Sequence, residues 1–247
     1  MFARRNRKHR RVGGSGRRDA EAATHAHPPS RTPPVDRPHG PWDIGEVDAD
    51  SGRVDLGGLQ IPGAPGMELR VEVTNDQIVA ATVVLAGGAV QLQPFAAPRT
   101  EGIWRDVRQE IAATVTQQGG VTDEDWGPLG PELRAQVPMW QQDGSRGVQT
   151  VRFVGCDGPR WFLRGVISGQ AAVSPETAGL VEDVFRSVVV VRGDEPMPPR
   201  EPIPLRLPPG SGGLGVAQGP GDPASDADAP APHLDPFTRG PEITQTR

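Results

Sequence analysis

The sequence predicts one α+β domain, in which an antiparallel sheet of about six strands packs against two helices. Residues 67–95 contain three apolar segments separated by short turns, a pattern typical of an antiparallel meander. Residues 148–169 contain two more apolar segments around an Asp-Gly-Pro break, which predicts a β-hairpin at the centre of the chain. Two amphipathic segments, one before and one after this hairpin, predict the helices.

Composition divides the chain into this domain and two tails. The sequence has Gly 32 and Pro 28 among 247 residues, about a quarter of the chain and near the level at which low-complexity segments are expected. Residues 1–41 and 208–247 lack apolar periodicity, so we expect both tails to be disordered. Residues 42–207 remain as the domain, which is long enough to bury a core without a disulfide or a metal.

The predicted sheet begins with a short strand at residues 53–59 that ends in a turn. Residues 67–73 alternate apolar and polar side chains, as a half-buried strand does. Residues 78–85 and 89–95 complete the meander, with Asn-Asp and Gly-Gly pairs supplying the two turns. Residues 133–137 predict one more short strand before the central hairpin.

The first helix is predicted at residues 101–118, with Thr100 as the N-cap and Gly119-Gly120 as the stop signal. Its apolar side chains fall on one stripe that would face the sheet. The members of this stripe are Trp104, Val107, Ile111 and Val115.

The second helix has three consecutive start signals. Ser174 is an N-cap residue type, Pro175 suits the first helical position, and Glu176 places an acid in the first turn. Residues 188–191, four valines in a row, leave this helix either as a buried strand or as an extended helix end.

Prolines crowd residues 195–209 and impose an extended path. Such a segment can be a ligand for a proline-recognising partner. Alternatively, Ile203, Leu205 and Leu207 lay it as a strap across the domain's own surface, and their alternation favours this second interpretation.

Several kinds of catalysis are excluded because all five histidines and the only lysine lie outside residues 42–207. The domain lacks the base for a Ser-His-Asp, Cys-His or Ser-Lys arrangement, and the lysine for a pyridoxal Schiff base or a P-loop. Cys156 is the only cysteine, so no internal disulfide and no zinc site of the His/Cys type is expected. We therefore expect no cofactor.

Acidic residues cluster at Asp123-Glu124-Asp125, where they could hold a hard cation. The cluster has no EF-hand spacing, so a solvated loop without a metal is the simpler interpretation.

Three arginines of the central hairpin are the remaining candidates for a site. Arg152 and Arg164 would lie on neighbouring strands with Arg160 at the turn, and together they could bind an anion. Alternatively, they form ion pairs with nearby carboxylates and cover a face of the sheet. The carboxylates considered are Asp157, Glu132 and Asp183.

The N-terminal tail opens with a basic arm, residues 1–18, which carries a charge of +8. The whole chain carries −5, so the rest carries −13. Such an arm is usually a solvated, disordered tail, but it can contact nucleic acid or an anionic surface, and it can also fold back onto the chain's own acidic domain. Its candidate contact residues are Arg4, Arg5, Arg7, Lys8, Arg10 and Arg11.

Within the basic arm, the glycine-rich residues 12–16 stand where a signal peptide would have its apolar segment. No window of about 18 apolar residues is present for a membrane span. A single cysteine is typical of a reducing compartment. We therefore expect a cytoplasmic protein without a membrane span.

Several long motifs resemble those of one known family. They are VDLGGLQIPG (54–63), QLQPFAAPRTEGIW (91–104), TVTQQGG (114–120), DGPRWFLRG (157–165) and VVVRGDEPMPPR (189–200). Together they resemble the actinobacterial domain-of-unknown-function family 3710, over roughly residues 40–208. This resemblance implies a single domain of bacterial, cytoplasmic origin, and it assigns no activity, cofactor or catalytic residue.

Three functions are compatible with the sequence. The missing catalytic side chains favour a non-catalytic cytoplasmic binding or adaptor module, with its sheet face or its proline-rich strap meeting a protein partner. The alternative is a contact with nucleic acid or an anionic surface through the basic arm. The third is an enzyme that uses the three hairpin arginines for a phosphorylated or carboxylated ligand.

Overall fold

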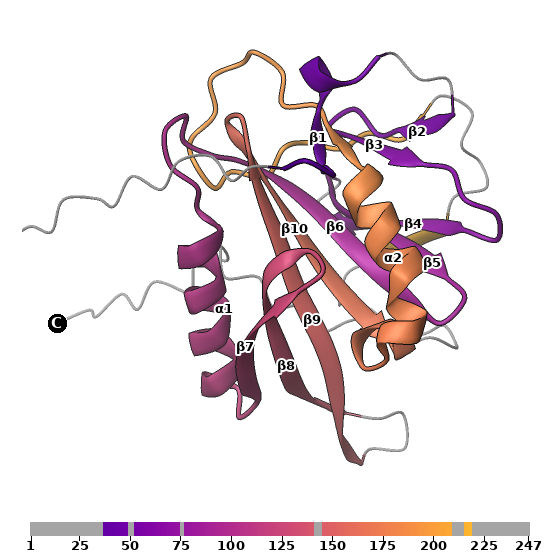
Figure 1. Ribbon diagram of the computed structural model, residues 1–247, viewed down its shortest axis with the longest axis vertical. Helices are drawn as coiled ribbons and strands as arrows, with labels where there is room; N and C mark the ends of the chain where they lie inside the picture. Colours follow the sequence, from indigo (N-terminus) through magenta and orange to yellow (C-terminus); the bar gives the residue numbers. More distant parts are fainter. Residues whose placement is uncertain (1–36, 49–51, 75–76, 141–144, 209–214, 219–247) are drawn as a thin grey trace, which may run out of the picture. The chain divides into compact units, whose positions relative to one another are not determined.

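The computed structural model describes residues 37–48, 52–74, 77–140, 145–208 and 215–218. All of them belong to the second of two units of the chain, which spans Arg31–Arg247. The fold of the described residues is α+β, as predicted, with two α-helices and a large sheet (Figure 1).

Seven antiparallel strands form most of the large sheet. The predicted meander is confirmed as β4 (Glu68–Thr74), β5 (Gln77–Leu85) and β6 (Gly88–Ala96). The order across the sheet continues from β6 with β10 (Trp161–Gly169), β9 (Arg146–Gly158), β8 (Gly130–Trp140) and β7 (Val121–Gly127).

Helix α1 (Trp104–Gln117) covers one face of this sheet. All four residues of the predicted apolar stripe are buried, and they pack with the sheet residues Phe95, Leu133, Phe153 and Phe162. The helix begins later than predicted, because Ile103 and not Thr100 is the N-cap residue, and the side chain of Ile103 makes no capping hydrogen bond.

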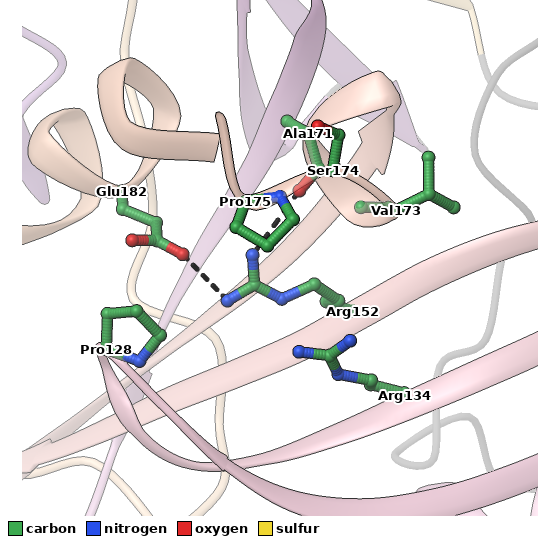
Figure 2. A pocket seen from close by; sticks show the side chains of 9 residues that line it. Pro128, Arg134, Arg152, Ala171, Val173, Ser174, Pro175 and Glu182 are labelled. Atoms are coloured by element: carbon green, nitrogen blue, oxygen red, sulfur yellow. Dashed lines mark hydrogen bonds and ion pairs between the residues drawn. The ribbon is translucent and has the colours of Figure 1, made fainter. Parts of the chain in front are cut away.

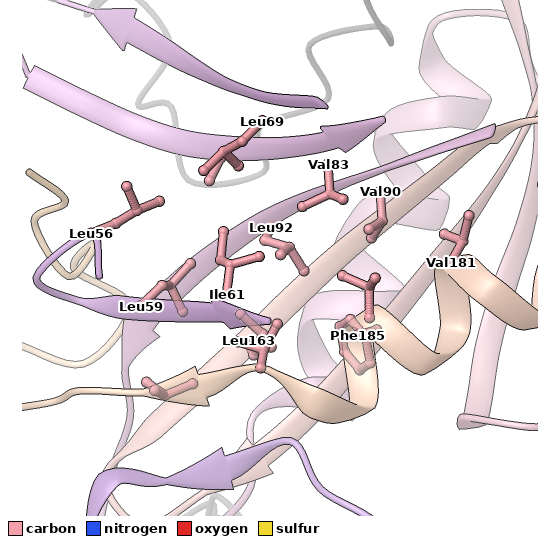
Figure 3. Packing of buried hydrophobic residues seen from close by; sticks show 14 of the residues in the cluster. Leu56, Leu59, Ile61, Leu69, Val83, Val90, Leu92, Leu163, Val181 and Phe185 are labelled. Atoms are coloured by element: carbon pink, nitrogen blue, oxygen red, sulfur yellow. The ribbon is translucent and has the colours of Figure 1, made fainter. Parts of the chain in front are cut away.

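Helix α2 (Pro175–Ser187) and a small sheet cover the other face. The helix begins at Pro175, as predicted. The small sheet has the order β1 (Trp42–Asp43), β11 (Val189–Val190), β3 (Leu59–Pro62) and β2 (Arg53–Asp55). Its buried leucines and valines meet Leu92, Leu163 and Phe185 in a second core (Figure 3). The valine run after α2 is therefore a buried strand.

The central hairpin turns two residues later than predicted. Asp157 and Gly158 continue β9, and Gly158 pairs with Trp161, so that the turn consists of Pro159 and Arg160. Arg160 has a φ of 63°. A Cβ atom at Gly158 would lie 2.1 Å from the Trp161 ring, so the strand continues past Asp157 only because this position is a glycine.

The prediction of a loop at residues 123–125 is wrong, because these residues belong to strand β7. The predicted short strand at 133–137 is the middle of the longer strand β8. The first difference arises because β7 is exposed over most of its length, so its sequence lacks the apolar alternation that marks a strand.

The proline-rich segment is a strap across the domain's own surface, which decides between its two interpretations. Ile203 and Leu205 are buried in the core beneath the small sheet. The amide of Ile203 donates to the Pro94 carbonyl at 2.9 Å, and Leu205 forms a bridge with Ile78 of β5.

Beyond this strap, β12 (Gly215–Gln218) lies parallel to β4 at one edge of the large sheet. The strand falls inside the segment that lacks apolar periodicity. The predictions of disorder for residues 1–36 and 219–247 lie outside the described residues.

Candidate functional site

The three candidate arginines lie on the central hairpin, but the structure does not bring their side chains together. Arg152 lies on β9 opposite Ile167, and Arg164 lies on β10 opposite Gly155. This register directs Arg152 to the face covered by α2 and Arg164 to the face covered by α1. One anion therefore cannot contact both, and the shared anion site is not formed.

Arg152 is the centre of a buried ion network. Its side chain is 4% exposed, and Glu132 and Glu182 beside it are also buried. Nη2 donates to Glu132 Oε2 at 2.7 Å and to Glu182 Oε1 at 2.8 Å, and Nε donates to Glu132 Oε1 at 3.1 Å. Nη1 donates to the Ala171 carbonyl at 3.3 Å (Figure 2). The alternative of an ion pair with Glu132 thus holds for Arg152.

The charge state of Arg152 is fixed by these partners. Burial on its own would lower the pKa of the guanidinium. The hydrogen bonds and charges of Glu132 and Glu182 outweigh burial, so the pKa lies above its ordinary value. The guanidinium therefore stays protonated and cannot serve as a general base.

Two further arginines complete the network at its solvent side. Arg134 Nε lies 3.2 Å from Glu132 Oε1 and 3.2 Å from Asp125 Oδ2. Arg186 Nη2 lies 3.7 Å from Glu182 Oε2, and its Nη1 donates to Asp183 at 2.9 Å. Each buried glutamate thus faces two guanidinium groups.

A cavity of about 70 Å³ lies beside Arg152 (Figure 2). Residues of the β7–β8 turn, of β8 and β9, and of the start of α2 line it; they include Pro128, Arg134, Ser174 and Pro175. Small-molecule sites usually have about 300–1,000 Å³, and one water takes about 30 Å³. The cavity has room for about two waters and not for a metabolite.

Arg164 and Arg160 have separate partners. Arg164 is buried, its Nη2 donates to Gln93 Oε1, and its guanidinium lies 5.6 Å from the centre of the Phe95 ring. Arg160 Nη2 donates to the Gly193 carbonyl at 3.0 Å and lies 3.6 Å from Asp194 Oδ1. Both arginines hold parts of the domain together.

Asp157 caps helix α1 from the central hairpin. Its Oδ1 accepts a hydrogen bond from the Ile103 amide at 2.8 Å, and its Oδ2 accepts one from the Trp104 amide at 3.2 Å. Burial raises the pKa of this carboxyl, and the two backbone hydrogen bonds oppose the rise. The sequence around the helix start does not predict this role, because Asp157 lies 53 residues from Trp104 in the chain.

The remaining candidates are also structural or outside the described residues. Burial raises the pKa of the Cys156 thiol to about 12, so the nucleophilic thiolate is absent at neutral pH. Within the described ranges, no group of three His, Cys, Asp or Glu residues could hold a metal ion. The candidate contact residues of the basic arm, Arg4, Arg5, Arg7, Lys8, Arg10 and Arg11, lie outside the described residues.

Among the described residues, no helix and no strand of the small sheet covers one end of the large sheet on the α2 side. Here β8 and β9 run on past both helices (Figure 1). Val121 is paired with Gln136 and Pro138 with Val148, so these four side chains lie in two neighbouring rows on the face opposite α1. Val121 is 66% exposed and Val148 is 65% exposed. We call this surface, with the adjoining edge strand β7, the β7–β9 end.

The sequence offered no way to find this surface, because Val148 and Val121 have the residue type of core positions. Only the length of α2, which stops short of these rows, leaves them exposed.

The α-helices within the described part of the chain are too short or too polar to span a membrane. No curated protein matches the chain. A scan against models of protein families matches residues 40–212 to one described as "Protein of unknown function (DUF3710)". Since the match covers well over half of the chain and agrees with the motif resemblance, the chain belongs to the DUF3710 family.

Proposed function

We propose that the protein is a non-catalytic binding module whose protein partner contacts the β7–β9 end. The observation that carries this proposal is that Val121 and Val148, in neighbouring rows on one face of the large sheet, are both exposed. Single exposed apolar side chains are common on protein surfaces, whereas apolar groups gathered on one exposed face are typical of interaction sites.

The chemistry of the interior supports a binding role over an enzymatic one. The buried cations and acids that could act on a substrate are used for structure: Arg152 holds two glutamates, and Asp157 caps a helix. The cavity beside Arg152 is too small for a substrate.

The fold also narrows the choice of contact surface. A partner at the strap would meet few apolar groups, because Ile203 and Leu205 are buried inward. Helix α1 covers one face of the large sheet, and α2 with the small sheet covers most of the other (Figure 1). The uncovered end is the place where a sheet face can still meet a partner.

Site-specific photo-crosslinking in the source cells tests this proposal. A photoreactive residue replaces Gln136, which is exposed in the middle of the β7–β9 end. A matched control places it at Leu180, which is 61% exposed on α2. We expect a discrete protein adduct from position 136 and none from position 180. Equal adducts from both positions, or an adduct from position 180 alone, would reject the β7–β9 end as the contact surface.

A further inference from the structure

We propose that edge strand β7 binds an extended, arginine-containing peptide segment of a partner, which adds to the large sheet as a further strand. This inference rests on the proposed binding function and names the chemistry of the partner.

The two edges of the large sheet differ. At one edge, β12 pairs with β4 and satisfies its backbone groups. At the other, β7 pairs with β8 on one side, and no described strand lies on its other side. An edge strand of seven residues without an internal proline can accept another strand through its outward N–H and C=O groups.

The charges on β7 select the kind of strand that can add. Asp123 and Asp125 lie on the α2 side of the sheet, where Asp125 Oδ2 is 3.2 Å from Arg134 Nε. Glu124 lies on the α1 side opposite Leu133, 3.4 Å from Arg108 Nε, and its side chain is still 54% exposed. An incoming strand also alternates its side chains between the two faces. Acids on both faces therefore match a segment with basic side chains at consecutive positions, and they repel the acidic edge of a second copy of this chain.

Trp126 favours arginine over lysine in that segment. Its side chain is 78% exposed at the end of β7, on the α1 side where it is paired with Pro131. A guanidinium stacks on an exposed indole face, and its planar fork also suits a carboxylate such as that of Glu124. An arginine-containing strand can thus use both features of the edge at once.

Acids on an edge strand also have a protective use, since charge blunts edge-to-edge association. A purely protective strand would not need an exposed tryptophan beside the acids. The two explanations differ in one measurable respect, which is whether a basic strand pairs with the β7 backbone.

The test uses the full chain and synthetic nine-residue peptides. The probe has three consecutive arginines between β-branched residues, and a first control peptide replaces the central arginine by proline, which removes an N–H group. A second control replaces the arginines by glutamates. Affinity is measured by fluorescence anisotropy, and hydrogen exchange by NMR reports on the β7 amides.

We expect the arginine peptide to bind and to protect every second β7 amide, because alternate residues direct their N–H groups toward the open edge. The proline and glutamate peptides should bind at least about tenfold more weakly. On the protein, Asp123→Arg and Trp126→Ala should each weaken binding by about fivefold or more. Asp194→Arg, a charge-matched control in an exposed loop, should leave affinity within about twofold.

Three results would overturn the inference. They are no binding of the arginine peptide, equal binding of the proline peptide without amide protection, and protection of β7 that rises with protein concentration alone. The last would identify a second copy as the occupant. If the peptide does not bind but the crosslink from position 136 is still formed, the proposal of an added strand is wrong and the proposed binding function still stands. The two proposals can therefore fail separately.

Discussion

Arg152 is the residue on which the interior beneath α2 most depends, because its guanidinium is the counter-charge of two buried carboxylates. Removing one partner of a buried ion pair leaves an uncompensated charge in a medium of low polarity. We predict that Arg152→Met lowers the free energy of unfolding by about 3–5 kcal/mol, measured by urea denaturation. Arg186→Met, at the partly exposed rim of the same network, should cost less than about 1 kcal/mol. Equal effects of the two substitutions would contradict a central role for Arg152.

Asp157 makes the stability of the fold depend on pH. Its folded-state pKa lies above the ordinary value of 3.8 because burial disfavours the ionised carboxyl. The group's contribution is therefore fully present below its unfolded pKa and is lost as pH rises through the folded pKa.

The variant Asp157→Asn keeps an acceptor oxygen for the α1 cap but cannot ionise. We predict that wild-type protein loses stability relative to this variant as pH rises above the ordinary pKa of 3.8, in urea denaturation followed at each pH. A difference that stays constant, or that moves in favour of the wild type, would show that the carboxylate is the form the fold prefers.

Whether Arg152 and Arg164 lie on the same face of the sheet depends on where the central hairpin turns. A turn at residues 157–159 would pair Cys156 with Arg160 and hence Arg152 with Arg164, on one face. The observed turn pairs Gly158 with Trp161 and moves the register by an odd number of residues, which sends the two arginines to opposite faces. The sequence predicts that both lie on the hairpin strands, but their faces depend on a register that turn residues alone do not determine.

Among the elements, the proline-rich strap offers a direct test of packing, because its apolar residues alternate between buried and exposed positions. Leu205 is buried in the core of the small sheet, and Leu207, two residues on, is exposed. We predict that Leu205→Ala lowers the free energy of unfolding by about 2–5 kcal/mol. Leu207→Ala should change it by no more than about 0.5 kcal/mol, measured in the same urea series. Similar values for both would mean that the strap does not pack as described.

Elements with a strong periodic pattern were predictable, and edge elements were not. The stripe of α1 and the alternation of β4 follow directly from burial on one face. Strand β7 is an exposed edge, so it has few buried side chains to mark its sequence, and β12 is only four residues long. Their places in the sheet come from backbone pairing with β8 and β4, which a single sequence does not record.

At the scale of the whole molecule, the chain joins an acidic domain to a basic arm, residues 1–18 with a charge of +8. Contact of this arm with nucleic acid or an anionic surface stays a prediction from charge. If the arm binds duplex DNA, the logarithm of the binding constant should fall linearly with the logarithm of the salt concentration, with a slope no steeper than about −7. This limit follows because each phosphate charge that the arm neutralises releases about one counterion. Deleting residues 1–18 should abolish the binding in a filter or anisotropy assay. Salt-insensitive binding, or binding that survives the deletion, would reject this role.

In the described part of the chain, two layers cover the large sheet except at one end, and for this reason we propose the β7–β9 end as the binding surface. The most direct measurement is the affinity of the partner identified by crosslinking, by titration calorimetry, for the full chain and two arginine variants. We predict that Val148→Arg weakens binding by at least about tenfold, since it places a charge on the contact face. Leu180→Arg, on the equally exposed surface of α2, should leave affinity within about twofold. If Val148→Arg binds as tightly as the unaltered chain, the β7–β9 end is not the interface.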